Sequence, residues 1–238
     1  MGFFYIRFIS SAARFYSTQK STMLYFCLWA HLGISINMRH LDNLTTKQIT
    51  EKISKPTQST FDLADKLADT AYKQASVLIP FVRINDAWHI VFIRRAESEK
   101  DQHSGQVAFV GGKAEDFDKS AVNTALRETQ EEIGVIPDDV EVLGKLGFHY
   151  SVSHFEITPV IATMSWPCDL TLDPAEVSEV FTLPLSWLAD ENNYEIKTRQ
   201  LTDSNQKVPV IYYKKYKGQL LWGATARMML SLIKTLQE

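Results

Sequence analysis

The stretch from residue 111 to residue 135 constrains the fold of this chain more than any other part of its 238 residues. It reads GGKAEDFDKSAVNTALRETQEEIGV, which predicts that a glycine pair opens a loop and that a helix follows. Asp118 or Ser120 can cap the start of this helix, and Gly134 stands where helices commonly end. Apolar or small residues recur with helical spacing at Val122, Ala125, Leu126, Thr129 and Ile133. We therefore predict an amphipathic helix with one buried stripe.

Three carboxylates crowd one side of this predicted helix. Glu128, Glu131 and Glu132 are spaced i, i+3 and i+4, so they project together and repel one another. They also lie near the C-terminal end, where the helix dipole is already negative. A divalent cation would remove both costs, and hard carboxylate oxygens favour magnesium or manganese over zinc. Arg127, four residues before Glu131, can hold one carboxylate in place by ion pairing.

An acidic run on a helix is by itself most often a solvated face, but a glycine pair, an arginine and a third glutamate accompany it here. Together they resemble the signature of the Nudix hydrolases, enzymes that cleave a diphosphate linked to another moiety. The spacing from the first glycine to the Arg-Glu pair is one residue longer than in the general signature, as in the coenzyme A pyrophosphatase branch that it resembles. Arg94-Arg95, the run HSGQVAF from His103 and the sequence WGATA from Trp222 extend the resemblance.

This resemblance implies an α/β fold, a Nudix-type α/β/α sandwich with a mixed central sheet, in keeping with the irregular alternation of predicted strands and helices. It also implies a metal-dependent hydrolase that cleaves the pyrophosphate bond of coenzyme A or acyl-CoA to 3′,5′-ADP and (acyl-)4′-phosphopantetheine. The family usually has proline where this chain has Val110. Because valine is stiff but prefers extended geometry, we expect a small loss of loop preorganisation and no loss of chemistry.

The roles of the charged helix residues follow from the same resemblance. Glu128 and Glu132, one helical turn apart, are the predicted principal ligands of Mg²⁺ or Mn²⁺. Glu131 is a further ligand or the general base, and Arg127 is the catalytic residue that orients the carboxylates. A fourth acid could complete the metal shell from outside the helix, with Glu176 and Glu179 as candidates, although each is more often a solvated or capping acid.

The predicted substrate contacts lie upstream of the helix. They are Arg94, Arg95, His103, Gly105, Gln106, Gly111 and Gly112. Arginine is the better bidentate partner for phosphate, including the extra 3′-phosphate of coenzyme A, and Lys100 falls roughly where the branch often carries another arginine. Glycine permits close backbone approach to a phosphate or metal, and the resemblance suggests that a backbone carbonyl of this loop joins the metal shell. His149 and Tyr150 are further candidates, more often packed on a core at a strand end.

Two other functions stay open. One is a Nudix hydrolase of another nucleoside diphosphate derivative, such as NADH, ADP-ribose, an oxidised nucleotide or a dinucleoside polyphosphate. Tyr150 stands near the position where dinucleoside polyphosphate hydrolases carry a tyrosine, and relative turnover of coenzyme A and NADH would separate these substrates. The other is a non-catalytic Nudix-fold binding module. Such proteins commonly lose a glutamate of the signature, whereas all three glutamates are present here.

The chain is predicted to consist of residues 1–37 as an N-terminal extension, residues 38–73 as a short helical lead-in, and residues 74–238 as the Nudix hydrolase domain. The extension contains no acid and resembles either a mitochondrial transit peptide or a mis-called upstream start, with Met38 as the true beginning. We favour a spurious or disordered extension and a cytoplasmic protein, with the mitochondrial matrix as the alternative. The lead-in predicts two short amphipathic helices that could also help a homodimer form.

Composition excludes several classes of partner. The net charge is −3 and no basic stripe is present, so we predict no nucleic-acid binding and a small-molecule substrate. The apolar run of residues 23–36 is too short for a membrane span, so no membrane partner is expected. Cys27 and Cys168 form neither a disulfide framework nor a metal-ligand pattern, which indicates a reducing compartment.

Alternating apolar runs predict the remaining elements. They are a strand hairpin over residues 75–84 and 87–94, a short strand at 106–109, strands at 140–152, 155–164 and 180–183, a short helix at 185–188, a second hairpin over 194–199 and 208–213, and a C-terminal helix over 222–236.

Overall fold

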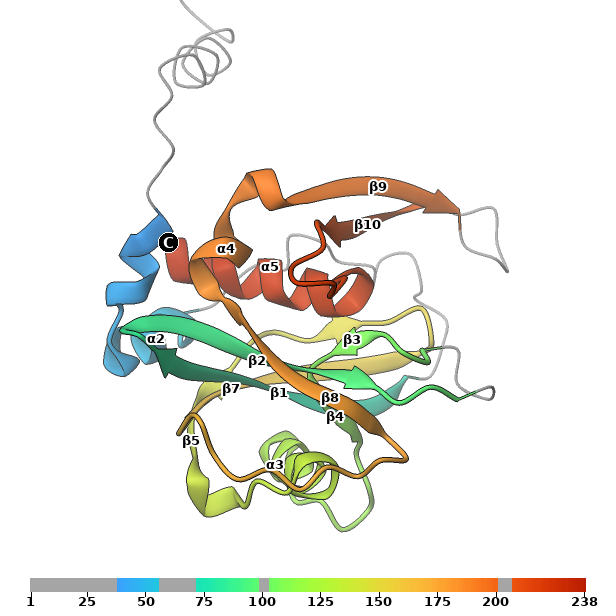
Figure 1. Cartoon of the computed structure of the whole chain (residues 1–238). Helices are drawn as coiled ribbons and strands as arrows, with labels where there is room; N and C mark the ends of the chain where they lie inside the picture. Colours follow the sequence, from blue (N-terminus) through green and yellow to red (C-terminus); the bar gives the residue numbers. More distant parts are fainter. Residues whose placement is uncertain (1–37, 56–71, 99–102, 201–206) are drawn as a thin grey trace, which may run out of the picture. The chain divides into compact units, whose positions relative to one another are not determined.

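The computed structural model of the chain describes residues 38–55, 72–98, 103–200 and 207–238 (Figure 1). The helices are η1 (Met38–Asn43), α2 (Thr46–Ile53), α3 (Ala121–Ile133), η3 (Pro137–Asp139), α4 (Leu185–Ala189), η4 (Glu191–Asn193) and α5 (Gly223–Gln237). The strands are β1 (Lys73–Ile84), β2 (Ala87–Arg95), β3 (Val107–Ala108), β4 (Val110–Lys113), β5 (Val140–Lys145), β6 (His149–Tyr150), β7 (Phe155–Met164), β8 (Val177–Pro184), β9 (Tyr194–Gln200) and β10 (Lys207–Tyr213).

The long strand β1 is the centre of a mixed sheet. It runs parallel to β7 along one edge. Along the other edge its first half pairs antiparallel with β4, and its second half pairs antiparallel with β2. The outer strands β5 and β6 pair with β7, and β3 and β8 pair with β2. β9 and β10 form a separate two-stranded sheet. β1 therefore carries neighbours along both edges, and β4, which holds the glycine pair, is fixed directly against it.

Helices cover both faces of the sheet, and each face has its own core (Figure 1). The side chains of β1 alternate between the two: Ile79 and Phe81 join the core shared with α2, α4 and α5, whereas Leu78 and Val82 join the core shared with α3. Runs that are apolar at nearly every position suit a strand covered on both sides. The predicted α/β/α sandwich with a mixed central sheet is confirmed.

Local turn chemistry accounts for the first hairpin. Asn85 and Asp86 both have positive φ, at 50° and 61°, which matches the two-residue turn whose twist suits antiparallel strands. The β1–β2 and β9–β10 hairpins are both present as predicted.

The structure differs from the predicted elements at two places. Gly111 and Gly112 lie within strand β4, not in a loop, because both pair with β1. Val110 accordingly adopts the extended backbone that valine prefers and is fully buried. The predicted strand over residues 140–152 is instead two strands, β5 and β6, because its pairing with β7 shifts register at Gly144 and stops after residue 145.

The lead-in is described only in part. Leu41, Ile49 and Ile53 are buried in the core on the α5 side of the sheet, so η1 and α2 pack on the sheet as expected. Thr45 caps α2 through a reciprocal pair of hydrogen bonds with Gln48. The predicted second helix of the lead-in and the extension over residues 1–37 lie outside the described residues.

Candidate active site

The glycine pair allows two unusually close approaches to the protein's own atoms. Gly111 has φ +149°, and a Cβ there would lie 2.3 Å from the carbonyl oxygen of Ser76 on β1. A Cβ on Gly112 would lie 2.6 Å from the carboxylate carbon of Glu128. A side chain at Gly111 would therefore clash with the backbone of β1, whereas one at Gly112 would displace the end of the Glu128 side chain. The sequence predicted close approach to a phosphate or metal; the structure shows close approach to β1 and to a carboxylate of α3.

Glu132 is a buried carboxylate that is only half satisfied. Its side chain is 2% exposed, and its Oε2 accepts a hydrogen bond of 3.1 Å from the backbone N–H of Gly111. Its Oε1 is buried without a hydrogen-bond partner. Burial first, and then the nearby charges of Glu176 and Glu128, raise the pKa of Glu132 to about 8 against the opposing effect of the Gly111 hydrogen bond. A cation at Oε1 would relieve both the desolvation and the repulsion.

Glu128 lies beside Glu132 in a partly buried position. Burial is the main cause that raises the pKa of its carboxyl, and Glu131 and Glu176 add to it. Arg127 opposes this shift through an ion pair of 2.9 Å between its Nη1 and Glu128 Oε1. Glu176 is thus close enough to both glutamates to influence their ionisation, although it comes from the segment before β8 and not from α3.

Arg127 is held by carboxylates on two sides. Its Nε and Nη2 donate to the two oxygens of Asp118 at 3.1 and 3.0 Å, and Nη2 also donates to the carbonyl oxygen of Lys113 at 3.1 Å. Its Nη1 donates to Glu131 at 2.7 Å, which confirms the predicted i, i+4 ion pair. Arg127 lowers the pKa of Asp118 to about 2. Ser120, and not Asp118, caps the helix, which leaves Asp118 to hold the arginine.

The side chains around Glu132 have the chemistry of a divalent cation site. The unpartnered Oε1 of Glu132, the raised pKa values of Glu128 and Glu132, and the nearby Glu176 describe a cluster of oxygen donors that a cation would stabilise. Within the described residues, no group of three His, Cys, Asp or Glu side chains has metal-binding geometry. The donor chemistry nevertheless suits magnesium or manganese, and Arg127 pairs with both Glu128 and Glu131 beside it.

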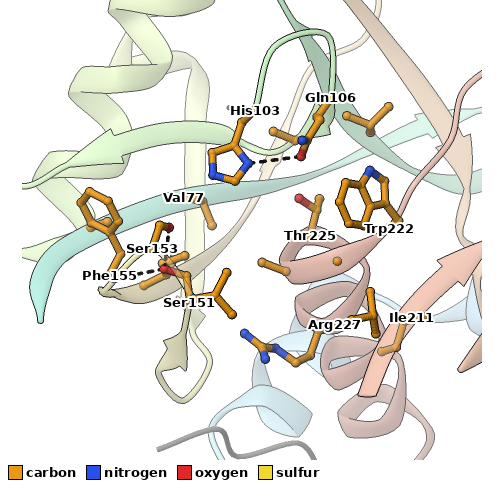
Figure 2. Close-up of a pocket in the computed structure, with 18 of the residues that line it drawn as sticks. Val77, His103, Gln106, Ser151, Ser153, Phe155, Ile211, Trp222, Thr225 and Arg227 are labelled. Carbon is orange, nitrogen blue, oxygen red and sulfur yellow. Dashed lines mark hydrogen bonds between the residues drawn. The ribbon is translucent and has the colours of Figure 1, made fainter. Parts of the chain in front are cut away.

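A cavity of about 760 Å³ lies on the face of the sheet opposite α3 (Figure 2). Its walls come from β1 and β4, the segment of residues 151–155, the β9–β10 hairpin and the start of α5. Figure 2 shows Trp222, Thr225 and Arg227 on one side and Ser151, Ser153 and Phe155 on the other. The predicted substrate contacts that line it are Arg95, His103, Gln106, Gly111 and Gly112. Because the glycine pair borders both the cavity and the carboxylates, it joins the two.

The adjacent arginines of the upstream motif diverge. Arg95 lines the cavity, and its charge lowers the pKa of Glu132. Arg94 is directed elsewhere: its Nη1 donates to the carbonyl oxygen of Gly105 at 3.3 Å, its Nη2 donates to Gln219, and its Nε lies 3.6 Å from Glu179. Arg94 and Gly105 therefore support the loop that carries His103 and Gln106 instead of lining the cavity. Lys100 lies outside the described residues.

Of the two acids proposed to complete the metal shell, only Glu176 influences the glutamates of α3. Glu179 accepts a hydrogen bond of 2.9 Å from Gln219 and pairs with Arg94. Of the two candidates near the cavity, His149 is buried, and burial together with the charge of Arg227 lowers its pKa to about 3. The carbonyl oxygen of Tyr150 accepts a hydrogen bond from Arg227.

Comparison with known proteins identifies the family. The NUDIX domain family matches residues 73–203, more than half of the chain. The chain belongs to the Nudix hydrolases. Relatives named as uncharacterized Nudix hydrolase NudL are 34% identical to it in Pectobacterium atrosepticum, over 66% of this chain and 79% of the relative, and 34% identical in Escherichia coli K12, over 68% and 81%. A MutT/nudix family protein from Enterococcus faecalis of known crystal structure is 13% identical, with a TM-score of 0.44 over 79% of this chain and 73% of that protein.

The sequence did not indicate the roles of several residues in this Nudix hydrolase site. Asp118 precedes Arg127 by nine residues, outside the helical spacings that predict side-chain contacts. Arg199 and Trp222 line the cavity from elements far beyond the signature, and only the WGATA sequence drew attention to the second of them. In the described parts of the chain, no helix combines the length and apolar character that crossing a bilayer requires.

Proposed function

We propose that this Nudix hydrolase cleaves the pyrophosphate bond of coenzyme A or acyl-CoA to 3′,5′-ADP and (acyl-)4′-phosphopantetheine. The observation that carries the proposal is the glycine pair, with the half-satisfied carboxylate of Glu132 on one side and the cavity on the other. Arg95, His103 and Gln106 of the upstream motif line that same cavity, which supports a role in substrate binding. The cavity volume of about 760 Å³ suits a ligand of nucleotide size.

In the proposed mechanism Glu128 and Glu132 would hold Mg²⁺ or Mn²⁺, with Glu176 near them. When bound, the metal would neutralise the pyrophosphate oxygens and acidify a water molecule. Arg127, held by Asp118, keeps the carboxylates of Glu128 and Glu131 in position. Glu131 is exposed to solvent and serves as a further ligand or as the general base that accepts the proton of the attacking water.

The rest of the chain positions the substrate. Arg95 brings positive charge to the end of the cavity nearest Glu132, where the pyrophosphate would lie. The ring Nδ1 of His103 lies 3.3 Å from the Gln106 side chain, which orients both at the cavity edge. The water oxygen attacks one phosphorus as the bridging P–O bond breaks, and the leaving phosphate departs with the bridging oxygen.

Incubation of the full chain with coenzyme A and Mg²⁺ or Mn²⁺, with resolution of the products, tests this proposal. We expect 3′,5′-ADP to appear with the unaltered protein and to be lost with Glu132→Gln. Turnover of NADH or another nucleotide without cleavage of coenzyme A would overturn the substrate. Absence of turnover of every such substrate, with ligand binding retained in Glu128→Gln and Glu132→Gln, would instead support a binding module.

The organisation of the chain is part of the proposal. Residues 74–238 would form the catalytic domain and residues 38–73 its lead-in, which is supported by the burial of Leu41 and Ile49 in the core that α5 shares. We propose a cytoplasmic location, with the mitochondrial matrix as the alternative if residues 1–37 target the protein. A small molecule is the proposed partner, and the lead-in could also support a homodimer.

A further inference from the structure

Part of the cavity is built from chain that the family match does not include. The glycine pair and α3 lie within the matched residues 73–203, whereas the cavity walls from β10 and from the start of α5 lie beyond them. Function depends on sites that are added to a shared fold. The walls from the β9–β10 hairpin and the start of α5, which lie at the end of the match or beyond it, are therefore where this chain can discriminate among pyrophosphate substrates.

Trp222 presents a supported aromatic ring to this part of the cavity (Figure 2). Its ring is stacked on that of Tyr212 from β10, with centroids 5.5 Å apart and planes inclined by 6°. A backbone bridge also joins these two residues. A flat ring that is held by a second ring can bind a planar base with little loss of conformational freedom.

Arg199 adds a positive charge to the same wall. Its guanidinium carbon lies 5.6 Å from the centroid of the Trp222 ring, and its Nη1 donates to the hydroxyl of Tyr212 at 3.4 Å. Arg199 lines the cavity and, among the described residues, has no carboxylate partner. Arg94, in contrast, is paired with Glu179. The remaining N–H donors of Arg199 are a fork suited to the oxygens of a phosphate.

Two parts of the cavity lining differ in chemistry. Arg95 and the glycine pair border the carboxylates of α3, where the proposed function puts the pyrophosphate, whereas Arg199 and Trp222 line the cavity from the β9–β10 hairpin and the start of α5. We call Arg199 and Trp222, with the supporting Tyr212, the hairpin wall. We infer that the hairpin wall binds the nucleoside half of the substrate, with Trp222 stacked on the base and Arg199 paired with a phosphomonoester on the ribose. This inference rests on the proposed function and names which half of the substrate enters the cavity.

The decisive experiment compares coenzyme A with dephospho-coenzyme A, which lacks only the ribose phosphomonoester, in the full chain with Mg²⁺. We expect Arg199→Gln to lower kcat/KM for coenzyme A by about 10- to 100-fold, mainly through KM. The same variant should change kcat/KM for dephospho-coenzyme A by less than about 2-fold, because the lost charge has no phosphate to meet.

Lys197→Gln is the matched control. Lys197 lies on the same strand, pairs with Glu195 at 2.6 Å, and stands 5.5 Å from the Tyr212 ring without lining the cavity. It should leave the preference between the two substrates unchanged. The inference would be overturned if Arg199→Gln lowered kcat/KM equally for both substrates, or if Lys197→Gln had the same effect as Arg199→Gln. It would also be overturned if the loss of kcat/KM in Trp222→Leu grew with acyl-chain length, because the pantetheine arm would then lie at the hairpin wall.

Binding of the nucleotide products separates this inference from the proposed function. We expect 3′,5′-ADP to bind the unaltered chain at least about 10-fold more tightly than 5′-AMP, and Arg199→Gln to abolish the difference. Trp222→Leu should weaken both nucleotides, and Trp222→Phe should weaken them less. If coenzyme A is not cleaved but this binding pattern is observed, the proposed substrate is wrong and the role of the hairpin wall is supported. If coenzyme A is cleaved but the preference does not depend on Arg199, only the role of the hairpin wall is wrong.

Discussion

At the scale of single residues, the site depends on a carboxylate that the fold leaves incompletely compensated. Glu132 is buried with one oxygen bonded to the Gly111 N–H and the other without a partner. A buried charge of this kind is expensive unless a ligand satisfies it. The cost is concentrated where the family chemistry needs a metal, which is typical of functional sites.

Glu132→Gln tests this cost directly. The pKa of Glu132 is raised from 4.5 to about 8, so between these pH values the folded protein keeps a proton that the unfolded chain has lost. The free energy of unfolding of the metal-free protein therefore falls as pH rises from 4.5 to about 8, by at most about 1.4 kcal/mol per pH unit. We expect the variant to lose this pH dependence, to be at least as stable as the unaltered metal-free protein at pH 8, and to gain little from Mg²⁺ or Mn²⁺. Thermal unfolding with and without metal measures both effects. A variant that metal still stabilises fully would contradict the assignment.

Asp118→Asn tests the anchor of Arg127. The side chain of Asp118 is 5% exposed, and its replacement leaves the partly buried Arg127 with fewer charge-assisted bonds. We expect a loss of about 1–3 kcal/mol in the free energy of unfolding and about a 10- to 100-fold loss of activity. Asp116→Asn is the matched control, since Asp116 is exposed two residues earlier. Equal behaviour of the two variants in denaturation and turnover would show that Asp118 has no special role.

At the scale of elements, the site is made where strand β4 meets helix α3. Sequence periodicity was sufficient for α3, its Gly134 cap with φ 78° and both hairpins, because these depend on neighbours within a few residues. It was not sufficient for the glycine pair, because nothing local indicates that β1 lies beside β4. The split of the predicted strand over residues 140–152 has the same cause, since β7 decides where pairing stops.

Gly112→Ala isolates this contact between strand and helix. The added Cβ would meet the end of the Glu128 side chain, at 2.6 Å from its carboxylate, and would displace it without straining the backbone. We expect activity to fall about 100-fold while the free energy of unfolding changes by less than about 1 kcal/mol. Gly147→Ala, where a Cβ has open space, should change neither quantity. Measurements of kcat and of the denaturant midpoint for both variants test this prediction. Unaltered turnover in Gly112→Ala would mean that activity does not depend on the position of the Glu128 carboxylate.

At the scale of the described domain, stability is linked to a buried histidine on the cavity side of the sheet. Burial, and then Arg227, lowers the pKa of His149 to about 3. Between pH 6.5 and about 3 the unfolded chain takes up a proton that the folded chain does not, so stability is present at neutral pH and is lost as pH falls through this window. Strand β6, which carries His149, is held to α5 by the bond from Arg227 to Tyr150.

His149→Phe should remove this loss. From pH 6.5 to pH 5, we expect the free energy of unfolding of the unaltered protein to fall by about 2 kcal/mol more than that of the variant. Chemical denaturation at a series of pH values provides the comparison, and the difference between the two curves cancels the contribution of other groups. Parallel curves would mean that His149 titrates in the folded protein as it does in the unfolded chain.

The Nudix family, the layered α/β class, the extent of α3 and the Arg127–Glu131 pair could be predicted from the sequence alone, because each depends on short-range spacing of side chains. The burial of Glu132 against Gly111, the bonds from Arg127 to Asp118, and the different partners of Arg94 and Arg95 became visible only in the folded chain. The tertiary structure also brought Arg199 and Trp222 to the cavity that Arg95 lines. These arrangements join residues that are distant in sequence, so they depend on how the strands pair and pack, and no local periodicity records them.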